Sequence, residues 1–470
     1  MTSRRAVALA SAGAVLMIFI AGPARGHVPG SRPASTAPNI VFILTDDQRW
    51  DTLWAMPEVN ADLVDHGVTF SNSYDSDPLC CPSRASILTG TYSHTNHVYN
   101  NSLPGGGFQK FKDTSTVATW LQKAGYRTGL FGKYLNDYST RFSSYVPPGW
   151  DQWEAFTSSG GEGNYYGFDL SIDGVNTRFG SDVYSTDYLA GEVASFISST
   201  PSDQPLFLYF APKAPHAPAI PAIRHAHAFD GLAPWRPPSY NERDVSDKPQ
   251  YIQVLPPLTK QQKKSEDAFR RDQYNTLLAV DEAVGSIVST LSATGRLGDT
   301  MIVFTTDQGI LWGEHRWTYK TLPYEEAVRS PLVIRYDPLT STARTDDHFA
   351  LNIDYAPTFA DLAGITPPIP EDGASLIPLL SGPPGSWRTD FLLEHYDDGL
   401  ERPVPTYCGV RSDQWAYYKY GTDEQELYDL STDPYQQMNL ASDPNYGQIL
   451  SQLHDRMVVL CDPPPPGFTP

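Results

Sequence analysis

The chain has 470 residues, 40% of them hydrophobic, and a formal net charge of −20 at pH 7, with a sequence pI of about 4.8. This much apolar material can form a sizeable core, so a disordered chain is excluded. The negative charge repels nucleic acid and anionic membranes, and we therefore expect neither as a partner. An anionic substrate needs a local basic pocket that opposes the overall charge.

The N-terminus has the pattern of an export signal. Arg4 and Arg5 precede an apolar stretch that is short for a membrane span, and small residues suited to cleavage follow it. We expect a signal peptide over residues 1–26 and a linker over 27–38. The protein is then secreted or extracytoplasmic, with no membrane contact beyond the signal; the alternative is an uncleaved anchor. The paired arginines also resemble a twin-arginine signal, which leaves the export route open.

Apolar strands and amphipathic helices then alternate along the chain. Continuous apolar runs predict buried strands at 39–45, 127–131, 205–210, 301–305 and 331–335. Helical spacing of apolar residues, with a glycine soon after, predicts helices at 117–123 and 273–291. This alternation predicts an α/β fold with a large, mostly parallel sheet covered by helices on both faces. In such sheets functional residues gather at the carboxyl ends of the strands.

The pattern changes after residue 385, where short strands separated by turns replace the alternation. We expect strands at 391–396, 408–411 and 415–420, followed by a helix at about 446–459. The predicted organisation is therefore a catalytic domain over residues 39–385 and a small C-terminal α+β subdomain with an antiparallel sheet over 386–470.

Two of the predicted strands end in acidic or amide pairs. Asp46 and Asp47 follow the first strand, and Asp307 and Gln308 follow the strand at 301–305. Carboxylates held together repel each other unless a cation lies among them, and oxygen ligands suit calcium or magnesium. Taken alone, each pair would more often form a turn or a helix cap than a metal site.

The most informative stretch is Cys80-Cys-Pro-Ser-Arg84, which Ala85-Ser-Ile-Leu-Thr-Gly90 follows. By itself Cys80 could be a buried free thiol before a helix. The whole stretch, however, resembles the hallmark motif of the type I sulfatases, in which the first cysteine is oxidised to formylglycine. The resemblance implies an alkaline-phosphatase-like fold, a sulfatase activity, and a formylglycine-generating enzyme as a partner during maturation.

Other segments resemble the same family over nearly all the chain after the signal. They are Asn39–Asp47, Lys133 in Phe131–Tyr134, Pro215–Pro218, Asp307–Gly309, Lys320, Asp372–Leu380 and Glu426–Pro434. The similarity is greatest to the N-acetylglucosamine-6-sulfatases, on the segments Leu79–Arg84, Val98–Asn101, Gly132–Asn136 and Val146–Trp150.

This resemblance implies roles for individual residues. The expected catalytic residues are Cys80, Arg84, Lys133, His216 and Lys320. One divalent cation, expected to be Ca²⁺, would lie among Asp46, Asp47, Cys80, Asp307 and Gln308. The basic side chains would neutralise the sulfate oxygens, and His216 would protonate the leaving oxygen.

Two departures from the family pattern limit this transfer. Many sulfatases have Asn at the position of Gln308, so its ligation of the cation is an expectation only. Many also have a His shortly after the residue that matches Lys133, where this chain has Leu135 and Asn136. The base that assists sulfate expulsion is therefore open. His94 and His97 are candidates, and they could equally line a sugar pocket or cap a turn.

The expected substrate is a 6-O-sulfated N-acetylglucosamine-type sugar, and Asn100 and Asn101 are candidate sugar-binding residues because amides both donate and accept hydrogen bonds. A sulfated carbohydrate or an aryl sulfate is thus the expected substrate. The alternatives are a general arylsulfatase, a phosphonate or phosphodiester hydrolase of the same superfamily, and a pseudoenzyme that only binds sulfated glycans.

Two further cysteines, Cys408 and Cys461, lie in the expected C-terminal subdomain. In an exported protein they are expected to form a disulfide, and the alternative is two buried free thiols.

Overall fold

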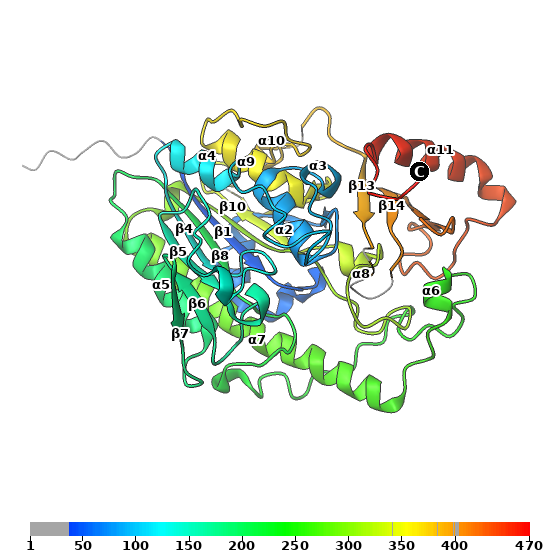
Figure 1. Ribbon diagram of the computed structural model, residues 1–470, viewed down its shortest axis with the longest axis horizontal. Helices are drawn as coiled ribbons and strands as arrows, with labels where there is room; N and C mark the ends of the chain where they lie inside the picture. The colour runs from blue at the N-terminus through cyan, green and yellow to red at the C-terminus, as the bar shows by residue number, and fades with distance from the viewer. Residues whose placement is uncertain (1–36, 341, 383, 398, 400–403) are drawn as a thin grey trace, which may run out of the picture.

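The computed structural model describes residues 37–470 except 341, 383, 398 and 400–403. The expected signal peptide, and all but the last two residues of the expected linker, lie outside the described residues. Figure 1 shows a large sheet with helices on both faces, and a smaller sheet beside it that carries the C-terminal helix. The predicted fold class is confirmed.

The main sheet has ten strands in the order β11-β2-β10-β9-β1-β8-β4-β5-β6-β7. Its parallel centre consists of β9 (Thr300–Thr306), β1 (Asn39–Thr45), β8 (Leu206–Ala211), β4 (Arg127–Gly132) and β5 (Gln152–Phe156). The flanking strands, mostly antiparallel to their neighbours, are β2 (Val68–Phe70), β6 (Asp169–Ile172), β7 (Val175–Arg178), β10 (Leu332–Arg335) and β11 (Arg344–Asp346). A separate pair is β3 (Ser73–Tyr74) with β12 (Ala350–Leu351).

Side chains of β1 show why helices cover both faces. Phe42 points to one face, where it contacts Tyr355 and Phe359 of α9 (Tyr355–Leu362). The hydrophobic cluster on that face also includes residues of α2 (Cys80–Thr89), α4 (Val117–Lys123) and α10 (Ile377–Ser381). Ile43 points to the opposite face, which α1 (Pro57–Asp62), α5 (Ser185–Ser199) and α7 (Lys260–Ala293) cover. Successive side chains of a strand alternate between faces, so an entirely apolar strand is buried on both sides. Shorter helices are α3 (Ser93–Asn96), α6 (Gln250–Gln253) and α8 (Glu325–Val328).

Helix α7 begins thirteen residues before the expected start at 273. Thr259 caps it, accepting a hydrogen bond from the backbone N–H of Gln262, and the first turns are polar and largely exposed. By length and composition this helix passes as a membrane span. Leu277, Val284 and Leu291, however, lie in the core beneath the main sheet, so α7 is a core helix.

The C-terminal subdomain contains an antiparallel sheet of β13 (Asp390–His395), β14 (Tyr407–Ser412), β15 (Trp415–Tyr420) and β16 (Gln425–Asp429), followed by α11 (Gly447–Leu460). One face packs against α11, where Cys408 and Cys461 are joined in a disulfide. The other face contributes Phe391 and Leu393 to a hydrophobic cluster shared with Tyr74 of β3, which fixes the subdomain against the catalytic domain.

Candidate active site

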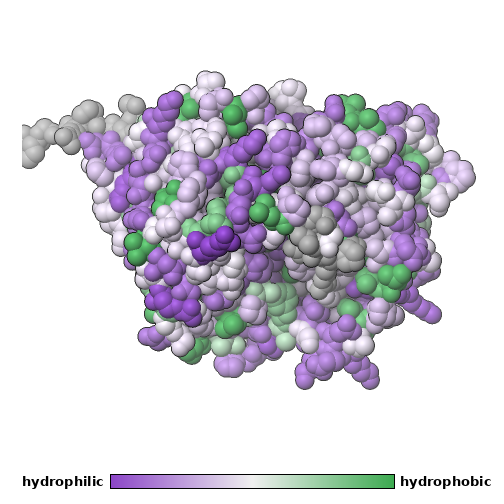
Figure 2. All heavy atoms as spheres, viewed as in Figure 1, coloured by the Kyte–Doolittle hydropathy of each residue, from purple (hydrophilic) through white to green (hydrophobic). Residues whose placement is uncertain are grey.

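The expected site residues meet at one edge of the sheet. Asp46 and Asp47 follow β1, Lys133 follows β4, His216 lies after β8, and Asp307 and Gln308 follow β9. These four strands are parallel neighbours, so their carboxyl ends meet at that edge. Helix α2 begins there with Cys80, and Figure 2 shows a hollow near the centre of this face, beside the strand ends seen in Figure 1.

Four oxygen-bearing side chains form the floor of the site and are almost completely buried: Asp46, Asp47, Asp307 and Gln308. The backbone N–H of Asp47 donates to Asp307 Oδ1 at 3.2 Å. Nε2 of Gln308 donates to Asp47 Oδ1, while Oε1 of Gln308 is buried without a hydrogen-bond partner among the described residues. An acceptor that is buried and unpaired carries a desolvation cost, and a cation would remove it.

Each carboxylate is matched by a basic side chain. Nζ of Lys133 lies 2.8 Å from Asp46 Oδ2, Nζ of Lys320 lies 2.7 Å from Asp47 Oδ1, and Nε of Arg84 lies 2.7 Å from Asp307 Oδ2.

Burial and these charges act in opposite directions on the acids. Burial disfavours ionisation of Asp46, but the charges of Lys133 and His216 outweigh it and hold the pKa of Asp46 well below its usual range. Burial raises the pKa of Asp307 to about 6, against the opposing charge of Arg84.

Cys80 lies at the centre of these groups. Its Sγ is 2.8 Å from Lys320 Nζ, 3.4 Å from Gln308 Nε2 and 3.9 Å from Asp46 Oδ1. Burial raises the pKa of the Cys80 thiol to about 11, although two lysines oppose the shift, so the unmodified thiol is a weak nucleophile at neutral pH. The next residue, Cys81, packs in the hydrophobic core instead.

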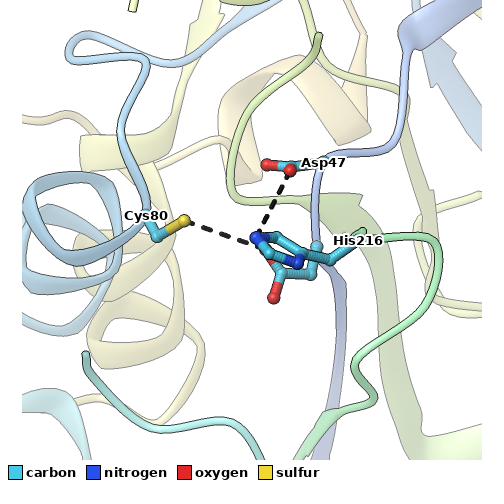
Figure 3. Close-up of side chains that lie close together, drawn as sticks. Asp47, Cys80 and His216 are labelled. Carbon is cyan, nitrogen blue, oxygen red and sulfur yellow. Dashed lines mark hydrogen bonds and ion pairs between the residues drawn. The ribbon is translucent and has the colours of Figure 1, made fainter. Parts of the chain in front are cut away.

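His216 enters from the loop after β8. Figure 3 shows its imidazole, the Asp47 carboxylate and the Cys80 sulfur converging from three separate segments, and Nε2 lies 3.6 Å from Asp47 Oδ2. Nδ1 lies 2.7 Å from the carbonyl oxygen of Ala217, and the Tyr165 hydroxyl donates to the backbone carbonyl of His216 at 2.7 Å. Burial lowers the pKa of His216, while Asp46 and Asp47 oppose this shift.

The same centre offers the ligand atoms of a metal site. Ligand atoms of Asp46, Asp47, Cys80 and His216 all lie within 4.8 Å of one another. With Asp307 and Gln308 beside them, the donors are predominantly hard oxygens, a set suited to Ca²⁺ or Mg²⁺.

The two candidate histidines beyond α2 lie elsewhere. Nδ1 of His94 is 3.0 Å from Glu394 Oε2 on β13; burial opposes the protonated form, but Glu394 outweighs it and raises the pKa of His94. His97 is exposed, has a left-handed backbone with φ of 63°, and lines a cavity of about 560 Å³ with Lys110 and Lys112. Within the described part of the chain, neither imidazole contacts Cys80.

The two candidate sugar-binding amides are almost fully buried. Asn101 Oδ1 accepts a hydrogen bond at 2.9 Å from the backbone N–H of Cys81, in the first turn of α2. Asn100 Oδ1 accepts from the backbone N–H of Asn101 at 2.7 Å, and Asn100 Nδ2 has no acceptor among the described residues. Asn101 therefore touches the helix that carries Cys80.

Sequence reasoning missed Lys213, which also lies at the carboxyl end of β8. This side chain is 2% exposed, and its Nζ lies 3.4 Å from His216 Nδ1. Burial lowers the pKa of Lys213, with Asp46 and Glu162 opposing the shift. Functional residues gather at the carboxyl ends of parallel strands, and Lys213 follows the strand predicted at 205–210 by only three residues. This position was the signal that could have identified Lys213.

Comparisons with known proteins identify the family. The Sulfatase family model matches residues 38–365, and the model of the N-sulphoglucosamine sulphohydrolase C-terminal region matches residues 313–462. The chain is 34% identical to the human N-acetylglucosamine-6-sulfatase over 85% of this chain and 74% of that protein. It is also 34% identical to the "Extracellular sulfatase SULF-1 homolog" of Drosophila melanogaster over 76% of this chain, but it spans only 33% of that relative's length.

A solved structure is similar over nearly the whole fold. It shows a protein in complex with its substrate D-glucosamine-2-N,6-O-disulfate, and it matches with a TM-score of 0.79 at 27% identity, covering 91% of this chain and 98% of that one. With the family match and the site geometry, this likeness leads to one conclusion: the chain belongs to the sulfatase family and is a sulfuric ester hydrolase.

Proposed function

We propose that this sulfatase releases inorganic sulfate from a 6-O-sulfated N-acetylglucosamine-type sugar, with formylglycine at position 80 as its nucleophile. The observation that carries the proposal is the position of Cys80, whose Sγ lies among Lys320, Gln308 and Asp46 at the first turn of α2. The substrate class is supported by the human N-acetylglucosamine-6-sulfatase and by the solved relative bound to a sulfated glucosamine.

The chemistry of sulfate transfer favours conversion of Cys80. A simple hydroxyl or thiol nucleophile would end as a stable sulfated adduct and trap the enzyme. A hydrated aldehyde carries two hydroxyls on one carbon, and the Sγ of Cys80 marks where these oxygens would lie. One hydroxyl attacks sulfur and the sugar alcohol leaves. The other hydroxyl then loses its proton, sulfate departs by cleavage of the carbon–oxygen bond, and the aldehyde is restored.

The residues at the floor of the site fit a divalent cation, and Ca²⁺ is the ion we propose. Asp46, Asp47, Asp307 and Gln308 would hold it together with an oxygen of formylglycine 80, and the unpaired Oε1 of Gln308 supports this assignment. When bound, such a cation lowers the pKa of the attacking hydroxyl and polarises the sulfate.

The basic residues of the site suit the recognition of sulfate. Lys133, Lys320 and Arg84 are buried and converge on the carboxylates around Cys80, so their charges act in a site from which water is largely excluded. Charge-assisted hydrogen bonds to sulfate oxygens would stabilise the negative charge that shifts between these oxygens during transfer.

His216 is suited to protonate the leaving alcohol. Because a carbonyl oxygen can only accept, the 2.7 Å contact with Ala217 requires that Nδ1 of His216 carries a hydrogen. Nε2 is therefore the atom that faces Asp47 and the substrate side, and the protonated imidazole can donate from it.

On the sugar side, Asn100 is the amide we assign to substrate binding. Its Nδ2 is a buried donor without an acceptor among the described residues, and a sugar hydroxyl or acetamide oxygen would satisfy it.

We also infer that the chain is exported. The signal-like N-terminus supports this inference, as does the word "extracellular" in the name of the Drosophila melanogaster relative.

Peptide mass spectrometry of the active enzyme, combined with a substrate panel, tests the proposal. Formylglycine is expected at position 80, and sulfate release is expected from N-acetylglucosamine 6-sulfate. Cys80→Ala should abolish turnover and leave folding intact, whereas Cys81→Ala is the matched control that keeps the modification. Unmodified Cys80 in fully active protein would refute the nucleophile, and strong activity on aryl sulfates without activity on any 6-O-sulfated sugar would refute the substrate.

A further inference from the structure

The buried lysine beside His216 lacks an anionic partner. Lys213 is 2% exposed, yet no carboxylate in the described part of the chain lies within 4.0 Å of its Nζ. Among the described residues, its close polar contact is His216 Nδ1 at 3.4 Å, and the centroid of the Tyr165 ring lies 5.9 Å from Nζ. A buried ammonium normally has a paired anion or several hydrogen-bond acceptors, because the loss of hydration is otherwise uncompensated.

The contact with His216 does not satisfy this lysine. Nδ1 of His216 donates its hydrogen to the carbonyl oxygen of Ala217 at 2.7 Å, so it has no lone pair left to accept from Lys213. In Figure 3 this second ring nitrogen lies on the side of the imidazole opposite the one that faces Asp47. The ammonium therefore lies on the Nδ1 side of the imidazole, and it is not one of the cations paired with Asp46, Asp47 and Asp307.

Asn136, which follows β4, is a second buried polar side chain with an atom that lacks a partner among the described residues. Asn136 is 5% exposed; its Nδ2 donates to Glu162 Oε1 at 3.2 Å, and its Oδ1 is buried with no hydrogen-bond donor among the described residues. The charges of Asp46 and Glu162 both act on Lys213, and neither carboxylate forms an ion pair with it. An unpaired cation and an unpaired acceptor thus lie at the ends of adjacent strands, β8 and β4.

We propose that Lys213 is a substrate-binding residue for a second anionic group of the sugar, a sulfate, sulfamate or carboxylate other than the ester being cleaved. This inference rests on the proposed function of the same site. The reacting sulfate already has Lys133, Lys320 and Arg84 as its cations, so a fourth cation on the far side of His216 serves a different anion. Asn136 Oδ1 would accept from an N–H or O–H next to that group.

The inference predicts a preference that depends on charge. The wild-type enzyme should cleave glucosamine N,6-disulfate with a higher kcat/KM than N-acetylglucosamine 6-sulfate. Lys213→Met keeps the length of the side chain and removes its charge. It should reduce kcat/KM for the disulfate by about 10-fold to 100-fold more than it reduces kcat/KM for 4-nitrophenyl sulfate, with the difference mainly in KM. A disaccharide that carries a neighbouring uronate and no sulfamate, assayed beside the disulfate, shows which of these anions Lys213 binds.

Two controls separate this role from others. Lys123→Met, at an exposed lysine of α4, is the matched substitution and should leave all three substrates unaffected. Inhibition of aryl sulfate turnover by glucosamine N-sulfate, which has no 6-sulfate, reports binding of the second anion without sugar turnover. Its inhibition constant should rise about 10-fold in Lys213→Met.

Equal losses on all three substrates would overturn the inference, because Lys213 would then act only by positioning His216. An unchanged preference and an unchanged inhibition constant in a folded variant would also overturn it. Failure of the proposed function differs from either result, since wild-type enzyme would then cleave the aryl sulfate and no sugar.

Discussion

Asn101 gives the sharpest test of how the nucleophile is positioned. Its Oδ1 accepts a hydrogen bond at 2.9 Å from the backbone N–H of Cys81, and Asn101 is only 7% exposed. This N–H belongs to the first turn of α2, where backbone donors have no partner within the helix. Asn101→Ala leaves that donor buried and unpaired, next to the residue that carries the reacting group.

The expected loss follows from this single contact. An unpaired buried N–H costs about 1–3 kcal/mol, so Asn101→Ala should lower the free energy of unfolding by that amount in denaturant titrations. A small displacement of Cys80 should reduce kcat/KM by about 10-fold to 100-fold on an aryl sulfate and on a sugar sulfate alike. Asn101→Asp retains an oxygen acceptor and places a negative charge at a helix N-terminus, so it should restore the stability.

A different outcome would refute this reasoning. If Asn101→Ala left the stability unchanged and impaired only sugar sulfates, Asn101 would act directly on the substrate and not through Cys81. The sugar-binding role expected from the sequence would then hold for this amide as well as for Asn100.

Three further measurements address the cation, the disulfide and a buried acid. Exhaustive chelation should abolish sulfate release and added Ca²⁺ should restore it; full activity with no metal by elemental analysis would contradict the proposed cation. Cys408→Ser opens a disulfide that spans 53 residues and should lower the free energy of unfolding by about 4 kcal/mol on the chain-entropy model, and an unchanged denaturation midpoint would argue against it. Burial raises the pKa of Glu154 to about 7, so the folded state binds its proton more tightly than the unfolded state, and stability falls as pH rises from about 4.5 to about 7. Glu154→Gln should therefore stabilise the protein by roughly 1–3 kcal/mol at pH 8 and by little at pH 5, while the exposed Asp65→Asn should show no such difference between the two pH values.

The central strands could be predicted because their sequence admits few other structures. Residues 39–45 and 301–305 are short apolar runs typical of a strand buried on both faces, and the structure places β1 and β9 there. The edge of the sheet gave no such signal. Strand β7 is almost entirely exposed, so it lacks an alternation of apolar and polar residues. Strand β2 has only three residues, which is too short for such an alternation to be recognised. The first turns of α7 are exposed and polar, so they carry no apolar stripe from which the start of the helix could be predicted.

Some features of the site could likewise be predicted from the sequence, and others could not. Asp46 and Asp307 were found because each directly follows an apolar run, and Cys80 was found through its motif. Contacts between distant segments could not be predicted. The Asn101 amide reaches Cys81 at a sequence separation of 20 residues, and His94 pairs with Glu394 at a separation of 300 residues. Local patterns locate residues at strand ends, but the partner that occupies a side chain depends on tertiary packing.

The charges at the site explain how a protein with a net charge of −20 binds an anion. Three buried carboxylates, Asp46, Asp47 and Asp307, are each paired with a buried cation, Lys133, Lys320 or Arg84, and Lys213 is a further buried cation without an ion pair among the described residues. Surface charges are screened over about 8–10 Å at physiological ionic strength, whereas buried groups are screened much less. A sulfate at the strand ends therefore experiences Lys133, Lys320 and Arg84 more strongly than the distant acidic surface. A bound divalent cation would add to this field, and the field would then favour a substrate with more than one negative group.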